Sequence, residues 1–134
     1  MPKPDPNWLL PEIALVIHDK QIQEHGGLAG IRDKVALDSA LNRPINYYSY
    51  GEADIFVPAA KYAAGIIKNH PFLDGNKRTG FLLAFVFLFI NNFELVATET
   101  DAALITKALA ANSITEEEFA IWLKDNSQPV SLKT

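Results

Sequence analysis

The chain has 134 residues, of which 49% are hydrophobic, with no cysteine and a formal net charge of −4. This length allows one hydrophobic core, so residues 1–134 are expected to form a single domain. The missing cysteines exclude disulfides and thiolate metal sites. The acidic balance argues against nucleic acid as a direct partner, because proteins that bind the phosphate backbone carry basic patches.

Nothing in the sequence predicts a membrane or secreted protein. The amino-terminal segment, MPKPDPNWLL, lacks a basic region followed by an apolar stretch, so it does not match a secretion signal. The apolar run from Phe81 to Ile90 is about half of the roughly 20 residues that a membrane span needs. We therefore expect a cytoplasmic protein with no membrane partner.

The amino-terminal part of the chain predicts an arm followed by a helix. Residues 1–10 contain three prolines and are expected to form an extended arm. A helix should begin at Pro11, which suits a first turn, and end at the glycine pair at 26 and 27. Its inward stripe is predicted to be Ile13, Val16, Ile17 and Ile22. Two histidines on this helix are interpreted as packing or surface residues, the usual roles of a lone helical histidine: His18 and His25.

Residues 26–33, GGLAGIRD, form a glycine-rich loop. The loop lacks the lysine spacing and the preceding strand of a phosphate-binding loop, so we reject that role. Asp33 is a predicted N-cap for a short helix from Lys34 to Asn42, which Pro44 should end. Its inward residues are predicted to be Val35, Leu37 and Leu41. Arg32 and Asp33 are interpreted as structural rather than catalytic.

Two further helices are predicted on either side of a polar loop. The first, Ile55 to Asn69, is rich in alanine, which indicates close helix packing, and it delivers His70 at its carboxyl end. The second, about Asn76 to Asn91, contains ten consecutive apolar residues and has no polar face, so other helices should surround it. Phe72 is expected to fix the loop onto the core.

The remaining residues predict a short strand and two more helices. Phe93 to Val96 can form a brief extended piece, and Thr100 with Asp101 should begin a helix with Leu104, Ile105, Ala108 and Leu109 inward. Thr115 and Glu118 match a capping box for the last helix, and residues 126–134 are expected to be a loose tail. The predicted fold class is all-α, with six or seven helices around a central buried helix.

The residues with the most chemistry lie between His70 and Gly80, in the stretch HPFLDGNKRTG. The first amide groups of a helix lack intrahelical partners and carry partial positive charge, so the start of the following helix can bind an anion. Lys77 and Arg78 add two cations there, although the helix dipole disfavours each of them by about 0.3 to 1 kcal/mol. Two cations at this end of a helix indicate a bound polyanion.

His70 and Asp74 extend this interpretation to a reaction. An imidazole can take a proton from a hydroxyl nucleophile, and an aspartate can hold Mg²⁺, which takes its other ligands from water and phosphates. The residues together predict phosphoryl or nucleotidyl transfer. Each residue alone has a structural explanation, such as a helix-end cation, a turn former, an N-cap or a solvated face. A purely structural loop would need all of these explanations to hold at once, so we favour the functional interpretation.

The stretch resembles the signature of the Fic superfamily, H-P-F-x-[DE]-G-N-G-R-x-x-R. It is closer to that of the Doc (death on curing) branch, H-x-F-x-D-[AG]-N-K-R, which this chain matches without a gap at His70, Phe72, Asp74, Gly75, Asn76, Lys77 and Arg78. The resemblance runs from about Pro11 to Lys124 in helix order and spacing, but it is specific only in this motif. Residues 45–54 have two interpretations. They can be a connecting loop whose aromatic side chains cover the core, or, as the resemblance implies, a flap that holds a target chain as an extra strand.

The resemblance implies a role for each matching residue. His70 would be the general base, and Asp74 would bind Mg²⁺ that arrives with ATP. The cofactor-binding residues would be Gly75, Asn76, Lys77 and Arg78. The last two would neutralise charge on the transferred group, which leaves little covalent chemistry for the protein.

Two departures from the broader pattern favour one kind of transfer. Lys77 stands where nucleotidyl-transferring members have glycine, and Phe81 stands where they have a second arginine. The lysine would crowd and charge the pocket that otherwise holds the α- and β-phosphates. Doc-like members share it and are understood to present the γ-phosphate of ATP and to phosphorylate elongation factor Tu. The resemblance therefore favours a protein Ser/Thr kinase over an AMP transferase, and a non-catalytic nucleotide- or partner-binding domain stays a third hypothesis.

The resemblance also bears on regulation. Many Fic proteins carry an inhibitory helix with the pattern [ST]-x-x-x-E-[GN], and Ser113 with Glu117 comes near it, but Glu118 occupies the last position. Without a built-in inhibitor, control is expected from a separate antitoxin of the Phd kind, whose disordered tail folds into a groove of the toxin.

Overall fold

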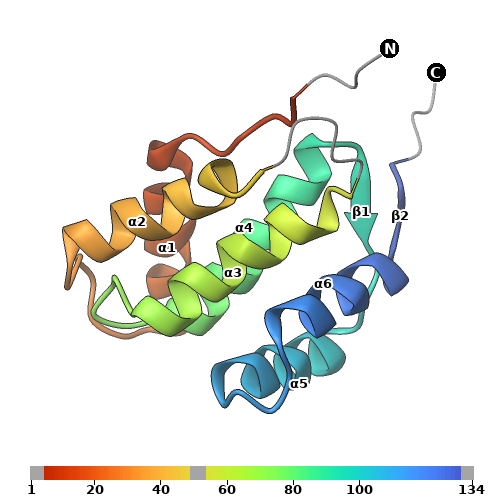
Figure 1. Ribbon diagram of the computed structural model, residues 1–134. Coiled ribbons are helices and arrows are strands. Elements are labelled where there is room, and N and C mark those ends of the chain that lie inside the picture. The colour runs from red at the N-terminus through yellow and green to blue at the C-terminus, as the bar shows by residue number, and fades with distance from the viewer. Residues whose placement is uncertain (1–4, 49–53, 131–134) are drawn as a thin grey trace.

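The computed structural model describes residues 5–48 and 54–130, which form a bundle of helices with one small antiparallel sheet (Figure 1). In chain order the elements are α1 (Pro11–His25), α2 (Lys34–Asn46), α3 (Phe56–Asn69), α4 (Asn76–Ile90), β1 (Phe93–Leu95), α5 (Glu99–Ala110), α6 (Glu116–Asp125) and β2 (Ser127–Pro129). The all-α prediction is confirmed, with six helices among the described residues. In the same residues, no helix is long and apolar enough to span a membrane.

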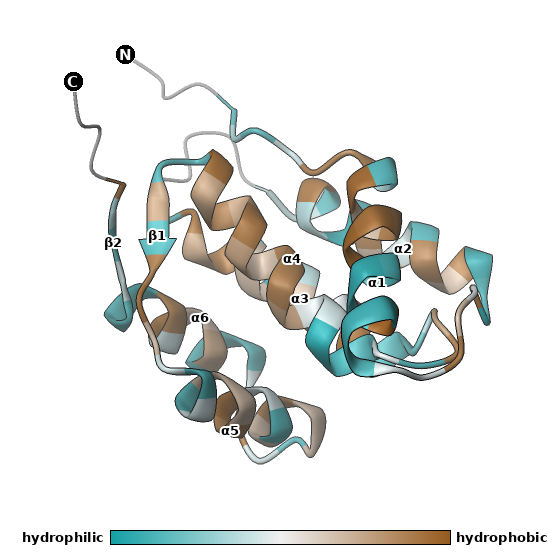
Figure 2. Cartoon of the chain, turned by 180° about the vertical axis from the view of Figure 1, so that it is seen from behind, coloured by the Kyte–Doolittle hydropathy of each residue, from teal (hydrophilic) through white to brown (hydrophobic). Residues whose placement is uncertain are grey.

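Helix α3 is the central buried helix. Ten of its 14 residues are buried, and it packs against α2, α4 and α6. Figures 1 and 2 show α1 and α2 on one side of the α3–α4 pair and α5 and α6 on the other. Helix α3 therefore connects the two halves of the bundle, and its last residue leads directly into the motif.

Small residues allow the central helices to approach closely. A Cβ atom added to Gly80 of α4 would lie 2.8 Å from Ile67 Cγ1 and 2.9 Å from the carbonyl oxygen of Ala63, both on α3. A Cβ atom on Gly65 of α3 would lie 3.0 Å from Ala40 Cβ on α2. The close packing predicted from the alanine-rich sequence of α3 is confirmed. Gly80 allows the close approach of α4 to α3, and Gly65 allows that of α2.

Helix α4 is apolar along most of its length (Figure 2), but it is less enclosed than the sequence predicts. Leu83, Ala84, Phe87 and Leu88 are buried, whereas Phe89 is 52% exposed and Ile90 is 37% exposed. The last turn of α4 is therefore not covered on all sides, and the expectation that other helices surround it is corrected.

The inward face of α1 also differs from the predicted stripe. The buried residues are Ala14, His18 and Gln21, while Ile13 and Val16 are exposed at 38% and 56%. The other two residues of the predicted stripe, Ile17 and Ile22, are half-buried, so the prediction is wrong only for Ile13 and Val16. The inward face is turned from the predicted stripe because it includes an imidazole. The predicted helix ends are confirmed, with Pro11 in the first turn and Gly26 at the C-cap with φ 80°.

Helix α2 begins as predicted and ends later. The Asp33 carboxylate accepts a hydrogen bond of 3.0 Å from the N–H of Ala36, so the predicted N-cap is confirmed. Pro44 lies inside the helix, which continues to Asn46, because a proline in the final turn keeps a helical φ and removes only one N–H donor. Of the predicted inward residues, Leu37 and Leu41 are buried, but Val35 is 79% exposed.

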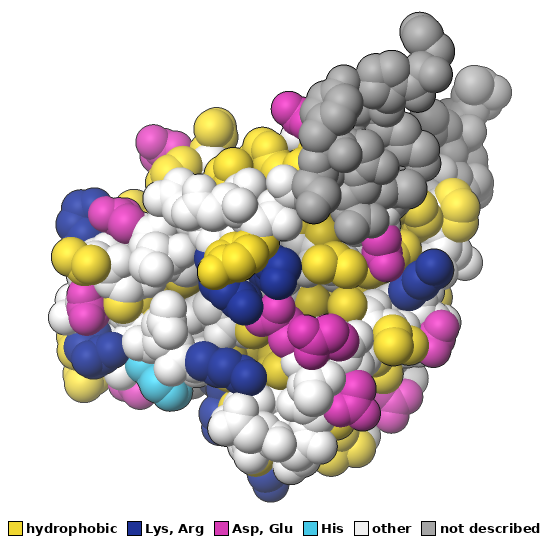
Figure 3. Space-filling model, viewed as in Figure 1, with side chains coloured by type: hydrophobic (Ala, Val, Ile, Leu, Met, Phe, Trp, Pro, Cys, Tyr) yellow, Lys and Arg dark blue, Asp and Glu magenta, His cyan; other side chains and the backbone are white. Residues whose placement is uncertain are grey.

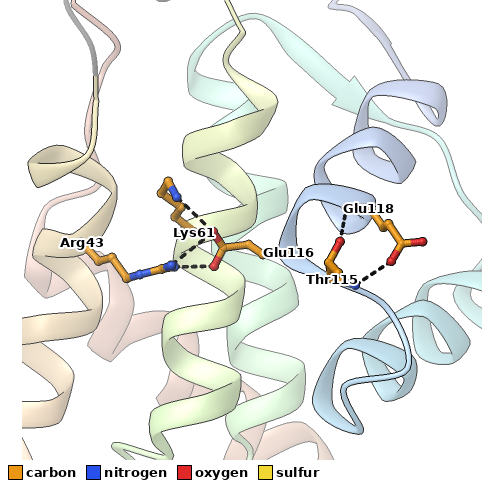
Figure 4. A network of polar contacts seen from close by, with 5 residues as sticks. All are labelled: Arg43, Lys61, Thr115, Glu116 and Glu118. Atoms are coloured by element: carbon orange, nitrogen blue, oxygen red, sulfur yellow. Dashed lines mark hydrogen bonds and ion pairs between the residues drawn. The ribbon is translucent and has the colours of Figure 1, made fainter.

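The carboxyl-terminal part is more ordered than expected as far as residue 130. Strand β2 pairs antiparallel with β1, with Glu94 opposite Gln128, so the segment that starts at residue 126 is not a loose tail. Thr98 caps α5 through the N–H of Asp101, slightly before the predicted start, and Leu104 is 62% exposed rather than inward. The capping box of Thr115 and Glu118 is confirmed (Figure 4).

The described part of the arm, residues 5–10, lies on the core. The indole of Trp8 stacks on Phe87 with ring centroids 5.7 Å apart, and the N–H of Leu9 donates to the Tyr62 hydroxyl at 3.1 Å. Trp8 also contacts Tyr48 edge to face, as expected for an aromatic lid. The flap interpretation falls largely on residues 49–53, which lie outside the described residues.

A charged network connects α2, α3 and α6. Glu116, in the first turn of α6, accepts hydrogen bonds from Arg43 of α2 and, at 3.0 Å, from Lys61 of α3 (Figure 4). Charged side chains of both signs gather over these helices at the centre of the face shown in Figure 3. Burial alone would raise the pKa of the Glu116 carboxyl, but the hydrogen bonds and charges of Arg43 and Lys61 outweigh burial and lower this pKa.

The substitution Glu116→Gln is expected to lower the free energy of unfolding by about 2 kcal/mol near neutral pH, because it leaves two cations without their carboxylate. Because the pKa of Glu116 is lower in the folded state than its ordinary value of 4.5, the ionised carboxylate stabilises the fold fully above pH 4.5. This stabilisation is lost as the pH falls through the pKa of the folded state. Urea unfolding should therefore show a difference between the two proteins at about pH 7 that shrinks as the pH falls below 4.5. Glu117→Gln, an exposed neighbour, is the control; an equal effect of both variants would contradict the network's role.

Candidate active site

The predicted site residues lie at the junction of α3 and α4. His70 is the C-cap of α3 in the left-handed conformation, with φ 49° and ψ 56°, and its N–H donates to the carbonyl oxygen of Ile66 at 3.2 Å. His70, Asp74, Lys77 and Arg78 are exposed, Gly75 is half-buried and Asn76 is buried. The most enclosed helix of the fold thus ends where the imidazole enters solvent.

The start of α4 is open to an anion. Its N-cap is Gly75, with φ 78°, and this residue supplies no side-chain hydrogen bond to the first amides of the helix. Left-handed backbone is readily adopted by glycine, and helix N–H groups without a side-chain cap can bind phosphate oxygens. Lys77 and Arg78 follow directly and are exposed, so positive charge and amides without a side-chain N-cap occur together.

The glycine-rich loop after α1 holds the motif loop by its backbone. Ile31 forms an antiparallel bridge with Phe72, and the carbonyl oxygen of Pro71 accepts the N–H groups of Arg32 and Asp33 at 2.7 and 3.0 Å. The N–H of Leu28 donates to the Asp74 carboxylate at 2.8 Å. These contacts give the glycine-rich loop a supporting function, consistent with our rejection of it as a phosphate-binding loop.

Arg32 covers the carboxyl end of α3. Its guanidinium group donates to the carbonyl oxygens of Asn69, at 2.8 Å, and His70. A cation that binds the last carbonyl groups of a helix satisfies them and interacts favourably with the helix dipole. The structural interpretation of Arg32 is confirmed by these contacts.

Phe72 and Asn76 set the shape of the loop. Phe72 is 1% exposed, as predicted for a residue that fixes the loop onto the core. The Asn76 carboxamide accepts from the N–H of Phe72 and donates to its carbonyl oxygen, both at 3.0 Å. Asn76 therefore has a structural role in this conformation, and its predicted contact with a phosphate stays a prediction.

Asp74 is the candidate metal ligand. Its carboxylate is exposed and one of its oxygens accepts the Leu28 N–H, which leaves lone pairs for a cation, since a carboxylate can accept about four hydrogen bonds. Among the described residues, no group of three or more His, Asp or Glu side chains could hold a metal ion. A single carboxylate suits Mg²⁺ that arrives with a nucleotide, because phosphates and water supply its other ligands.

His18 also contacts the motif, which the sequence did not predict. His18 of α1 is 2% exposed and stacks on Phe72 with ring centroids 3.8 Å apart. Its Nε2 atom lies 2.8 Å from the carbonyl oxygen of Asp74. The packing role considered for this histidine is correct, but nothing in the local sequence indicated that its partner would be the motif loop.

The fold and the motif define a member of the Fic/DOC family. The model of this family matches residues 8–88, more than half of the chain, and the chain belongs to the family. One relative, "Protein kinase doc" of Escherichia phage P1, is 30% identical over 115 residues, which cover 85% of this chain and 90% of the relative. Another, "Toxin Doc" of Mycolicibacterium smegmatis, is 36% identical over 74 residues, which cover 54% of this chain and 57% of the relative. The resemblance found in the motif is thus confirmed, including its Doc branch.

Proposed function

We propose that the protein is a Doc-like toxin that transfers the γ-phosphate of ATP to a serine or threonine hydroxyl of a translation factor similar to elongation factor Tu. The observation that carries this proposal is the start of α4, which has no side-chain cap, bears Lys77 and Arg78, and follows His70 after a short loop. The names of the relatives, a protein kinase and a toxin, support the same class of activity.

In this proposal His70 takes the proton of the target hydroxyl while the hydroxyl oxygen bonds to the γ-phosphorus. The bridging P–O bond breaks as the new bond forms, and ADP leaves. The amides at Gly75 and the start of α4 bind phosphate oxygens, and Lys77 and Arg78 neutralise the charge that spreads over the transferred group. Mg²⁺, if held by Asp74, would neutralise charge on the nucleotide phosphates. Positioning and electrostatics supply most of the catalysis.

Lys77 and Phe81 support phosphoryl transfer over AMP transfer. Lys77 is exposed in the first turn of α4, where it would crowd and charge a pocket for the α- and β-phosphates. The ring of Phe81 packs edge to face against Trp122 of α6, with centroids 6.3 Å apart. Position 81 therefore serves helix packing in this chain, whereas nucleotidyl-transferring members have a second arginine there.

The proposal includes a partner and a compartment. The relative named "Toxin Doc" supports a toxin. The partner that we propose is a separate antitoxin of the Phd kind, because a growth-arresting kinase without an inhibitory helix of its own needs a separate inhibitor. The target would be a cytoplasmic translation factor, so we place the protein in the cytoplasm. No direct contact with nucleic acid is required for this activity.

Labelled ATP separates the candidate functions. The protein is incubated with purified elongation factor Tu, and in parallel with a cell extract, together with ATP labelled at either the γ or the α position. We expect γ-label on one protein, released as phosphoserine or phosphothreonine after acid hydrolysis. Transfer of α-label would instead indicate an AMP transferase, and no transfer from either position would favour a non-catalytic nucleotide- or partner-binding domain.

A further inference from the structure

His18 contacts Phe72 and Asp74 of the motif loop and lies beside Gly75. Its ring lies parallel to that of Phe72, with 7° between the planes, and its Nε2 atom is within hydrogen-bond distance of the Asp74 carbonyl oxygen. A Cβ atom added to Gly75 would lie 3.8 Å from His18 Nε2 and 3.4 Å from Ile22 Cδ1. Helix α1 therefore forms the surface on which the turn before α4 rests.

The hydrogen bond determines the direction of the peptide between Asp74 and Gly75. A carbonyl oxygen only accepts, so Nε2 of His18 must carry the proton. The described peptide bonds are trans, and in a trans peptide the C=O and N–H groups point in opposite directions. Because the Asp74 carbonyl oxygen points to α1, the N–H of Gly75 points away from α1.

We propose that His18 is a positioning residue for phosphoryl transfer. Its Nε2–H holds the Asp74–Gly75 peptide so that the Gly75 amide, like the first amides of α4, is presented to a phosphate oxygen. The same contact places the Asp74 side chain, whose carboxylate is held on its other side by the N–H of Leu28. This inference rests on the proposed function for its catalytic consequence, whereas the hydrogen bond itself can be tested without any activity.

A packing role alone makes a different prediction from a positioning role. If His18 only filled space, a ring of similar size would replace it without a change in kinetics. If its donor orients the Gly75 amide, an apolar ring should fail and a side chain that keeps the donor should succeed. A small displacement of a group that binds the transferred phosphoryl group is costly, because catalysis by such groups depends on their preset geometry.

Two substitutions separate the ring from the donor. His18→Phe keeps the stack on Phe72 and loses the hydrogen bond, and we expect kcat/KM for ATP to fall by about 10- to 100-fold. His18→Gln places an amide N–H near the position of Nε2, and its kcat/KM should stay within about threefold of the wild type. His25→Gln, an exposed change on the same helix, should have no effect. Equal losses in the Phe and Gln variants, in proportion to their loss of thermal stability, would overturn the positioning role.

Two measurements on the intact protein do not depend on turnover. Nitrogen NMR of the wild type should show His18 as the Nε2–H tautomer, or as an imidazolium with Nε2–H in slow exchange. Hydrogen exchange at the Leu28 amide should accelerate about tenfold or more in His18→Phe and not in His25→Gln, because the anchored Asp74 carboxylate would be released. Unchanged exchange, or a proton found only on Nδ1, would reject the anchor. Anchoring without transfer in the wild type would reject the proposed function instead.

Discussion

The substitution His70→Ala is expected to reduce the rate of γ-phosphate transfer by about 10²- to 10⁴-fold, the usual contribution of a positioned general base. The imidazole is exposed at the end of α3, beside the loop that leads to the open start of α4. Without it, the target hydroxyl loses the proton acceptor that the proposed mechanism assigns to it. Single-turnover assays with γ-labelled ATP and the purified target would measure the loss directly.

The fold should survive this change because the contacts of residue 70 are made by its backbone. Its N–H donates to Ile66, and its carbonyl oxygen accepts from Arg32. Alanine at φ 49° costs about 1 kcal/mol; His70→Asn avoids most of that cost, since asparagine tolerates the left-handed region, and it still lacks a base. His25→Ala is the matched control. An asparagine variant with nearly full activity would remove His70 from the proposed mechanism.

Helix ends could be predicted well from the sequence because local residues determine them. Asp33, Thr115 and Gly26 each lie within four residues of the backbone groups they serve, so spacing alone identifies them. The continuation of α2 past Pro44 could not be predicted as well. Whether a proline ends a helix depends on whether the residues after it still find partners, which is decided by tertiary packing.

The inward faces were harder to predict than the helices themselves. In α1 the apolar pattern favoured Ile13 and Val16, but the buried face contains His18, whose ring stacks on a residue 54 positions later in the chain (72 − 18). Likewise, the pairing of β2 with β1 joins residues that are far apart in sequence. Periodicity within one segment carries no information about such partners.

The same distinction applies to the candidate site. Its chemical groups occur in one contiguous motif, so the sequence could identify them together. The groups that hold the motif loop come from elsewhere: His18, Leu28 and Arg32 contact residues that are 56, 46 and 38 positions away. The motif predicts which residues react, and only the structure shows which groups hold the motif loop.

The substitution Phe72→Ala should have the largest effect on stability, a loss of about 3 to 5 kcal/mol in the free energy of unfolding. The Phe72 ring is 1% exposed and fills the space between the motif loop and His18 of α1. Its removal leaves a cavity in a domain whose total stability is about 5 to 15 kcal/mol. Chemical unfolding monitored by circular dichroism would measure the difference.

The design isolates the ring because the backbone contacts of residue 72 remain in the variant. The Asn76 carboxamide still bonds to the N–H and carbonyl groups of that residue, and Ile31 still faces it in the bridge. Phe89→Ala on α4 is the matched control; its ring is 52% exposed, so it should cost less than about 1 kcal/mol. Similar losses for the two variants would mean that the ring of Phe72 does not hold the loop on the core. A large loss for Phe72→Ala alone would show that the loop and the core unfold together, as a site held by buried contacts requires.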